Sequence, residues 1–131
     1  MIRILCINDH LVARTMLSIM LSRTGYEVLT ADSSEEALEI LAKEPVDLII
    51  QDFIRPGMDG FEFLQRIKAD DRQKSVPVLV VESASRQHCV EQLGLLGLDI
   101  DHDLDGYLAG ITSHIDLVLT VRAILRKHGK I

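Results

Sequence analysis

The amino-acid sequence predicts a doubly wound α/β domain, in which helices cover both faces of a five-stranded parallel sheet. First, short apolar runs rich in branched residues recur along the chain, as expected of strands covered on both faces. Second, amphipathic segments of helical spacing separate these runs, and crossovers of this length require parallel strands with right-handed connections. Third, 131 residues, 47% of them hydrophobic, suffice for one core without a disulfide or a structural metal.

Five strands and four helices follow from these patterns. The predicted strands are residues 2–7, 26–30, 46–51, 76–81 and 104–109, and the predicted helices lie around residues 11–20, 37–41, 61–67 and 115–127. Two helix starts, Ser33 with Glu36 and Ser113 with Asp116, resemble capping boxes, and Gly25 ends the first helix. Because no repeat, linker or low-complexity segment divides the chain, residues 1–131 are expected to form a single domain.

Charge and composition argue against several classes of function. The 14 basic and 20 acidic side chains give a net charge of −6, and no basic cluster is present that could neutralise nucleic-acid phosphates. The longest apolar stretches, such as residues 76–81, are far shorter than the ~20 residues that cross a bilayer. The N-terminus also lacks the pattern of a secretory signal. We therefore expect a cytoplasmic protein that binds neither nucleic acid nor membrane, with Cys6 and Cys89 reduced.

Acidic side chains follow two of the predicted strands. Asn8 and Asp9 come directly after the first strand, and Asp52 comes after the third. Ligands of parallel α/β sheets bind beyond the carboxyl ends of the strands, so Asp9 and Asp52 converge if their strands are neighbours. Two carboxylates held together favour a hard cation such as Mg²⁺. Each also has a purely structural interpretation, Asp9 as a helix N-cap and Asp52 as a loop carboxylate that accepts backbone amides.

Several motifs spread along the chain form a known combination. They are Ile4-Leu5-Cys6-Ile7-Asn8-Asp9 with Arg14, Gly25-Tyr26-Glu27-Val28, Ala31, Glu36-Ala37-Leu38, and Asp52 followed three residues later by Pro56-Gly57-Met58-Asp59-Gly60. The combination closely resembles the receiver domain of bacterial two-component response regulators, over essentially the full chain. The resemblance implies a flavodoxin-like fold for residues 1–131, as a receiver domain with no output domain.

The resemblance also implies roles for individual residues. Asp52 would accept a phosphoryl group from a phosphohistidine of a sensor histidine kinase or phosphotransfer protein, with Mg²⁺ offsetting the charge of both reactants. Asp9 and Asp52 would bind the metal, together with the main-chain carbonyl of Ile54. Asn8, which replaces the usual acid, would act through a metal-bound water. Such a domain is not an enzyme but switches a surface that a downstream effector protein recognises.

Two family residues that contact the phosphoryl group are altered here. The hydroxyl position after the fourth strand falls on Glu82, or on Ser83 if the register shifts by one residue. Glu82 would oppose an incoming phosphate, whereas Ser83 would donate a hydrogen bond to it. The alternative interpretation of Ser83-Ala84-Ser85 is a helix cap. The lysine after the fifth strand aligns with Gly110, and no lysine occurs between residues 74 and 127. Loss of one preorganised charge commonly costs ~10²–10³ in rate, so phosphorylation would be impaired.

Three further features have alternative interpretations. Tyr107 matches the aromatic switch position of the family, or is a strand tyrosine packed at the sheet edge. Arg55 could reach back to a phosphate or lie solvated at the surface. Residues 101–106 fit the Asp-x-Asp-x-Asp-Gly opening of a calcium loop, but Thr112 stands where the bidentate glutamate belongs, and a solvated acidic turn is the alternative.

Two functions therefore remain open from the sequence. Asp9 and Asp52 favour a phosphoryl-accepting switch. Asn8, Gly110 and Glu82 favour a degenerate receiver that acts as a phosphorylation-independent protein-interaction module.

Overall fold

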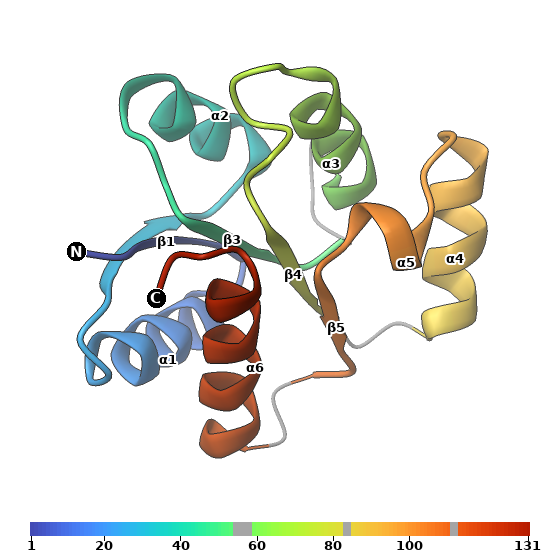
Figure 1. Cartoon of the computed structure of the whole chain (residues 1–131). Helices are drawn as coiled ribbons and strands as arrows, with labels where there is room; N and C mark the ends of the chain where they lie inside the picture. The colour runs from blue at the N-terminus through green and yellow to red at the C-terminus, as the bar shows by residue number, and fades with distance from the viewer. Residues whose placement is uncertain (54–58, 83–84, 111–112) are drawn as a thin grey trace.

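The structure is a computed structural model, and it describes residues 1–53, 59–82, 85–110 and 113–131. The described residues form alternating strands and helices from the N-terminus to the C-terminus (Figure 1). In chain order these are β1 (Arg3–Ile7), α1 (Leu11–Ser22), β2 (Glu27–Ala31), α2 (Ser34–Lys43), β3 (Leu48–Gln51), α3 (Gly60–Ala69), β4 (Val78–Val81), α4 (Arg86–Leu95), α5 (Ile100–Asp103), β5 (Gly106–Leu108) and α6 (His114–Lys127).

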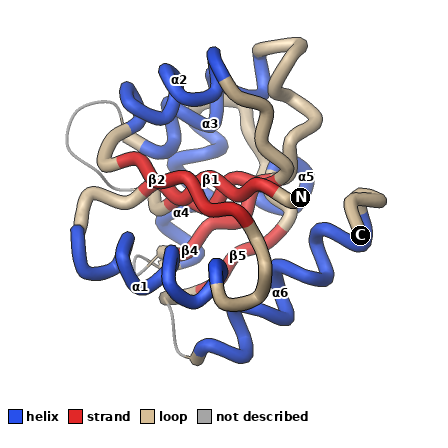
Figure 2. Tube along the Cα trace, turned by 90° about the vertical axis from the view of Figure 1, so that its left-hand side faces the viewer, coloured by secondary structure: helices blue, strands red, loops and turns tan. Residues whose placement is uncertain are grey.

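The strands form one parallel sheet in the order β2-β1-β3-β4-β5. Helices α1 and α6 cover one face of the sheet, and α2, α3 and α4 cover the other (Figures 1 and 2). The predicted fold class, a flavodoxin-like, doubly wound five-stranded parallel sheet with helices on both faces, is confirmed. Because β1 and β3 are neighbours near the centre of this sheet, the turns that follow them leave the same edge side by side.

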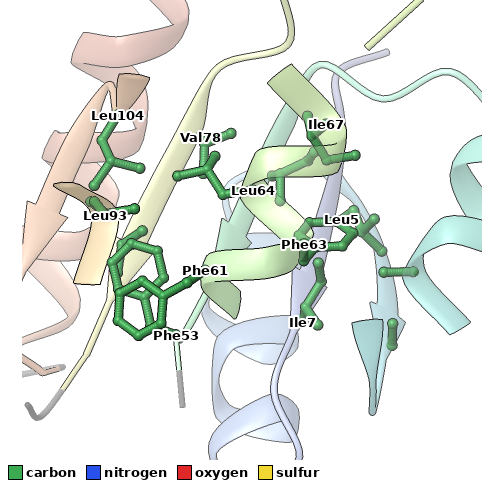
Figure 3. Close-up of a cluster of buried hydrophobic side chains, with 14 of the residues drawn as sticks. Leu5, Ile7, Phe53, Phe61, Phe63, Leu64, Ile67, Val78, Leu93 and Leu104 are labelled. Atoms are coloured by element: carbon green, nitrogen blue, oxygen red, sulfur yellow. The ribbon is translucent and has the colours of Figure 1, made fainter. Parts of the chain in front are cut away.

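Alternating side chains of the inner strands supply both hydrophobic layers. Leu5 and Ile7 of β1 belong to the layer beneath α2, α3 and α4, while Ile4 and Cys6 belong to the layer beneath α1 and α6. Figure 3 shows the first of these layers, where Leu64 and neighbouring side chains of α3 pack over β1 and β4. Burial of one such side chain stabilises the fold by about 1.5–3 kcal/mol, so the strands form a rigid frame for the turns at their ends.

Helix caps that the sequence predicted are present. The Ser33 hydroxyl accepts a hydrogen bond from the Glu36 amide at 3.1 Å, and the Ser113 hydroxyl accepts one from the Asp116 amide at 3.0 Å. Gly25 follows α1 with a φ of +92°, a left-handed conformation that glycine adopts without strain. The strands begin or end one to two residues away from their predicted limits, as is usual where tertiary pairing decides the ends.

The structure adds two helices that apolar spacing did not predict, α4 and α5. In α4 only Cys89 and Leu93 are buried, while Leu95 is exposed, so the sequence carries no broad apolar stripe. Ser85 caps α4 by accepting a hydrogen bond from the His88 amide, which agrees with the helix-cap interpretation of this segment.

Candidate functional site

Acidic residues follow three adjacent strands at the carboxyl edge of the sheet. Ile7 pairs with Gln51 across β1 and β3, so the chain runs from these paired residues toward Asp9 on one side and Asp52 on the other. Glu82 directly follows β4, the next strand of the sheet. Asp52 and Glu82 are only 8% and 6% exposed. Charges of one sign brought to one sheet edge favour binding of a cation, which offsets their mutual repulsion.

Asp9 has a carboxylate oxygen, Oδ1, that is buried and has no hydrogen-bond partner among the described residues. The N-cap of α1 is His10, which makes no side-chain cap bond, so Asp9 does not serve as the N-cap considered from the sequence. A buried acceptor left unsatisfied costs about 1–3 kcal/mol. A divalent cation would satisfy this oxygen, and the donor set at this edge therefore fits Mg²⁺.

Few side chains at this edge could bind a metal ion, and those that could would do so through oxygen atoms. Within the described ranges, no group of three or more His, Cys, Asp or Glu residues is arranged to hold a metal. Mg²⁺ commonly binds through one or two carboxylates and keeps several waters, which is the kind of site that Asp9 and Asp52 would make. The main-chain carbonyl expected from Ile54 lies outside the described residues, as does Arg55.

Asn8 has a structural role that the sequence did not predict. Its Oδ1 accepts a hydrogen bond from the His10 amide at 2.8 Å, and its main-chain carbonyl accepts one from Arg14 Nη1 at 2.8 Å. These bonds tie the turn after β1 to the start of α1. The Asn8 side chain keeps its amide donors and a second lone pair, which are groups that can bind a water.

Glu82 reaches from the end of β4 to the backbone beside Asp52. Its Oε2 accepts a hydrogen bond from the Phe53 amide at 2.7 Å, and its own amide donates to the Leu108 carbonyl of β5 at 2.9 Å. Hydrogen bonds to a carboxylate are roughly twice as strong as neutral ones. Glu82 thus joins the Asp52 turn to the edge strand β5. Ser83, the alternative occupant of the hydroxyl position, lies outside the described residues.

The backbone after Asp52 is held tightly against the start of α3. The Gly60 amide donates to the Phe53 carbonyl at 2.5 Å, and a Cβ at Gly60 would overlap the Asp52 carbonyl oxygen and Phe53 Cα. The Phe53 ring stacks on Phe61 with centroids 4.3 Å apart, as Figure 3 shows. Only glycine allows this approach. The sequence analysis used Gly60 as part of a family motif but did not predict this contact, which depends on tertiary packing.

Tyr107 of β5 lies partly buried against α4. Its hydroxyl is 3.8 Å from Cys89 Sγ, and it packs against the core layer beneath α4. Burial, followed by the contact with Cys89, raises the pKa of Tyr107 to about 12, and the charge of Glu82 adds to this effect. Burial likewise raises the pKa of the Cys89 thiol. Tyr107, Cys89 and Glu82 therefore influence one another electrostatically, a link that no spacing in the sequence indicates.

Gly110 follows β5 with a φ of +91°, and its amide donates to the Leu108 carbonyl at 2.9 Å. A tight turn in the left-handed region disfavours any side chain, lysine included. The left-handed backbone at this position therefore favours glycine over the lysine that the resemblance to receiver domains would place here. Residues 111 and 112 lie outside the described residues.

The aspartates of the calcium-like segment bind different partners. Asp101 pairs with Arg86 at 3.0 Å, and Asp103 Oδ2 accepts the Asp99 amide at 2.8 Å. Asp105 accepts the Val78 amide at 2.8 Å through Oδ2 and contacts His128 Nε2 at 2.7 Å through Oδ1. These carboxylates do not converge on one point, because Asp101 and Asp103 lie in or at the end of the short helix α5.

The amino-acid sequence matches a known protein family. Residues 4–100 match the model of the response regulator receiver domain. The phosphate regulon transcriptional regulatory protein PhoB of Pseudomonas aeruginosa is 29% identical over 126 residues, covering 96% of this chain and 52% of that protein. The two-component response regulator ORR3 of Oryza sativa subsp. indica is 35% identical over 94 residues, 68% of this chain and 72% of that protein.

Solved structures agree with the sequence matches. The chemotaxis response regulator CheY4 of Vibrio cholerae superposes with a TM-score of 0.82 and 29% identity, covering 95% of this chain and 99% of that one. The response regulator TrrA of Thermotoga maritima, in complex with Mg²⁺ and BeF, superposes with a TM-score of 0.80 and 26% identity. The match covers 95% of this chain and 100% of that one. The chain spans about half the length of curated relatives such as PhoB. In the part of the chain that the structure describes, no helix has both the length and the apolar character needed to cross a membrane.

Proposed function

Because this chain belongs to the response regulator receiver domain family, we propose that Asp52 accepts a phosphoryl group and that its phosphorylation switches a protein-interaction surface. The observation that carries the proposal is the buried Oδ1 of Asp9, which has no hydrogen-bond partner in the part of the chain that the structure describes. Asp9 follows β1, and Asp52 directly follows β3, the neighbour of β1 in the sheet. An acceptor carboxylate needs cationic help to approach an anionic phosphoryl group. The orphan oxygen of Asp9 is suited to holding such a cation.

The proposed reaction transfers one phosphoryl group and leaves no other product on the domain. A carboxylate oxygen of Asp52 forms a bond to phosphorus, and the P–N bond of a phosphohistidine on the donor protein breaks. The departing imidazole nitrogen takes up a proton. Positioning and charge compensation supply most of the rate in such transfers, so the role of the domain is to hold Asp52 in place.

Residues of this chain would share the task of binding Mg²⁺. Asp9 and Asp52 would supply carboxylate oxygens, the Ile54 carbonyl a main-chain oxygen, and Asn8 a hydrogen bond to a bound water. When bound, the ion would offset the charge of the carboxylates and the phosphoryl oxygens. The neutral Asn8 removes one negative charge from this set, so we expect weaker metal binding than an acid at the same position would give.

The response would pass to other proteins. A sensor histidine kinase or a phosphotransfer protein would supply the phosphoryl group, and a downstream effector would recognise the changed surface near β4, β5 and α4. Tyr107 lies in that region, paired with Val80 of β4 and with its hydroxyl 3.8 Å from Cys89 Sγ. The cytoplasmic location expected from the sequence remains a prediction.

A second function has its own supporting observations. Gly110 adopts a left-handed conformation where the family has lysine, and Glu82 places an acid next to Asp52. Both disfavour phosphorylation, and both are compatible with a degenerate receiver that binds its partner without it.

Incubation with Mg²⁺ and acetyl phosphate separates the two functions. The proposal expects a mass increase of one phosphoryl group in the native chain, dependence on Mg²⁺, and none in the Asp52→Asn variant. Asp71→Asn, which neutralises an exposed acid paired with Lys74, is the matched control and should behave as the native chain does. No incorporation into the folded native chain would favour the interaction module.

A further inference from the structure

We propose that the Glu82 carboxylate is an internal anion that opposes phosphorylation of Asp52 and leaves the Phe53 amide when phosphorylation occurs. The inference rests on the proposed function, since it concerns regulation of the same site. It starts from the 2.7 Å hydrogen bond between Glu82 Oε2 and the Phe53 amide. Phe53 is the residue after the acceptor, so Glu82 is bound to the backbone that carries Asp52.

Covalent geometry limits how far the two carboxyl groups can be apart. The Asp52 side-chain carboxyl carbon lies within about 5 Å of the Phe53 nitrogen, whatever its rotamer. With the 2.7 Å bond added, Glu82 Oε2 is within about 8 Å of that carbon. Both side chains are more than nine-tenths buried, so water screens their interaction poorly.

Phosphorylation increases the negative charge beside Glu82. Converting the Asp52 carboxylate to an acyl phosphate changes the charge of the group from about −1 to about −2. One additional charge about 7 Å from Glu82, at an effective dielectric constant of about 20, lowers the equilibrium constant for phosphorylation roughly 50-fold. Glu82 thereby keeps the phosphorylated fraction low unless a strong donor drives the transfer.

The same repulsion gives phosphorylation a route to β5. Glu82 is linked through its amide to the Leu108 carbonyl, and its charge acts on both Tyr107 and Cys89. When the carboxylate leaves the Phe53 amide, the end of β4 loses its bond to the Asp52 turn. The Tyr107 hydroxyl, 3.8 Å from Cys89 Sγ, then experiences a different field.

The experiment compares charge removal at Glu82 with charge removal elsewhere. Glu82→Gln keeps an oxygen that can accept the Phe53 amide but removes the charge, and Glu82→Ala removes both. Glu91→Gln is the matched control, because Glu91 is an exposed acid on α4 that bonds only a neighbouring side chain, Gln87, among the bonds described. In each reaction with acetyl phosphate, an Asp52 oxygen bonds to phosphorus and acetate leaves. Circular dichroism checks that every variant is folded.

The expected result is a 10-fold or greater rise in the rate of phosphoryl incorporation for Glu82→Gln, with Glu91→Gln unchanged. Amide NMR of the phosphorylated native chain should show shifts at Phe53 and Tyr107, and the Phe53 shift should be smaller in Glu82→Ala, which starts without the bond. Incorporation into the native chain at the same rate as into Glu82→Gln would overturn the inference while leaving the proposed function intact. Absence of incorporation into every folded variant would overturn both. Incorporation into Glu82→Gln alone would support the opposing effect of the Glu82 charge but would overturn the proposed phosphorylation of the native chain, and with it the movement of Glu82.

Discussion

The packing of α3 against the Asp52 turn predicts a large effect of adding one methyl group at Gly60. In Gly60→Ala the new Cβ overlaps backbone atoms of Asp52 and Phe53, which cannot rotate away as a side chain would. Overpacking of this kind costs about 1–3 kcal/mol, and loss of the Gly60 to Phe53 hydrogen bond costs about 1 kcal/mol. The higher helix propensity of alanine returns about 0.5–1 kcal/mol. We expect a net loss of about 1–3.5 kcal/mol, or a fall in Tm of about 4–13 °C for a chain of this length.

The same substitution should slow phosphorylation, because it displaces the backbone that carries Asp52. Misplacement of a reacting group by about 1 Å can cost ~10² in rate. Thermal unfolding followed by circular dichroism and phosphoryl incorporation from acetyl phosphate measure the two effects. Gly94→Ala is the control, since nothing lies within 4 Å of its new Cβ, and it should stabilise α4 by about 0.5–1 kcal/mol. A Gly60→Ala variant as stable and as readily phosphorylated as the native chain would refute this account of the contact.

Three further substitutions test other parts of the structure. Asp9→Ala removes a buried oxygen that has no hydrogen-bond partner among the described residues, so it should raise stability by about 1 kcal/mol in Mg²⁺-free buffer. It should also abolish the stabilisation that we expect Mg²⁺ to give the native chain. Lower stability than the native chain without Mg²⁺ would contradict this. Ser33→Ala removes the N-cap of α2 and should cost about 1 kcal/mol in urea unfolding, with no change in phosphorylation. Burial raises the pKa of the Cys6 thiol from 9.0 to about 12, so the stability due to its neutral form is complete below pH 9 and is lost as the pH rises toward 12. Cys6→Val should lose less stability over that interval than the native chain, and equal losses would show that Cys6 does not titrate there.

Much of the fold could be predicted because short stretches of sequence, through their apolar spacing and cap residues, indicate where strands and helices form. The apolar β1 and β3 runs indicate strands covered on both faces, and the cap residues Ser33 and Ser113 mark helix starts through bonds to amides three residues on. Helix α4 was missed because its buried face is narrow, with only Cys89 and Leu93 fully buried. Spacing cannot reveal a helix whose burial depends on the element it packs against.

For the candidate site too, the sequence could predict some residues but not the contacts that depend on tertiary packing. Asp9 and Asp52 could be named from the sequence because parallel strands end at one edge of the sheet. The partner of Glu82, the Phe53 amide, could not be named, since it depends on the register of β4 against β3. The close approach of Gly60 likewise depends on how the start of α3 packs against the backbone of Asp52 and Phe53.

Reductive trapping measures directly whether Asp52 accepts a phosphoryl group in the presence of Mg²⁺. The native chain is incubated with Mg²⁺ and a phosphoryl donor, and borohydride then reduces any aspartyl phosphate to homoserine, which peptide mass spectrometry locates. If Asp52 accepts the phosphoryl group with the help of an ion held by Asp9, homoserine appears at position 52, depends on Mg²⁺ and is reduced in Asp9→Ala. Trapping at another aspartate, or equal trapping at position 52 with and without Mg²⁺, would contradict it.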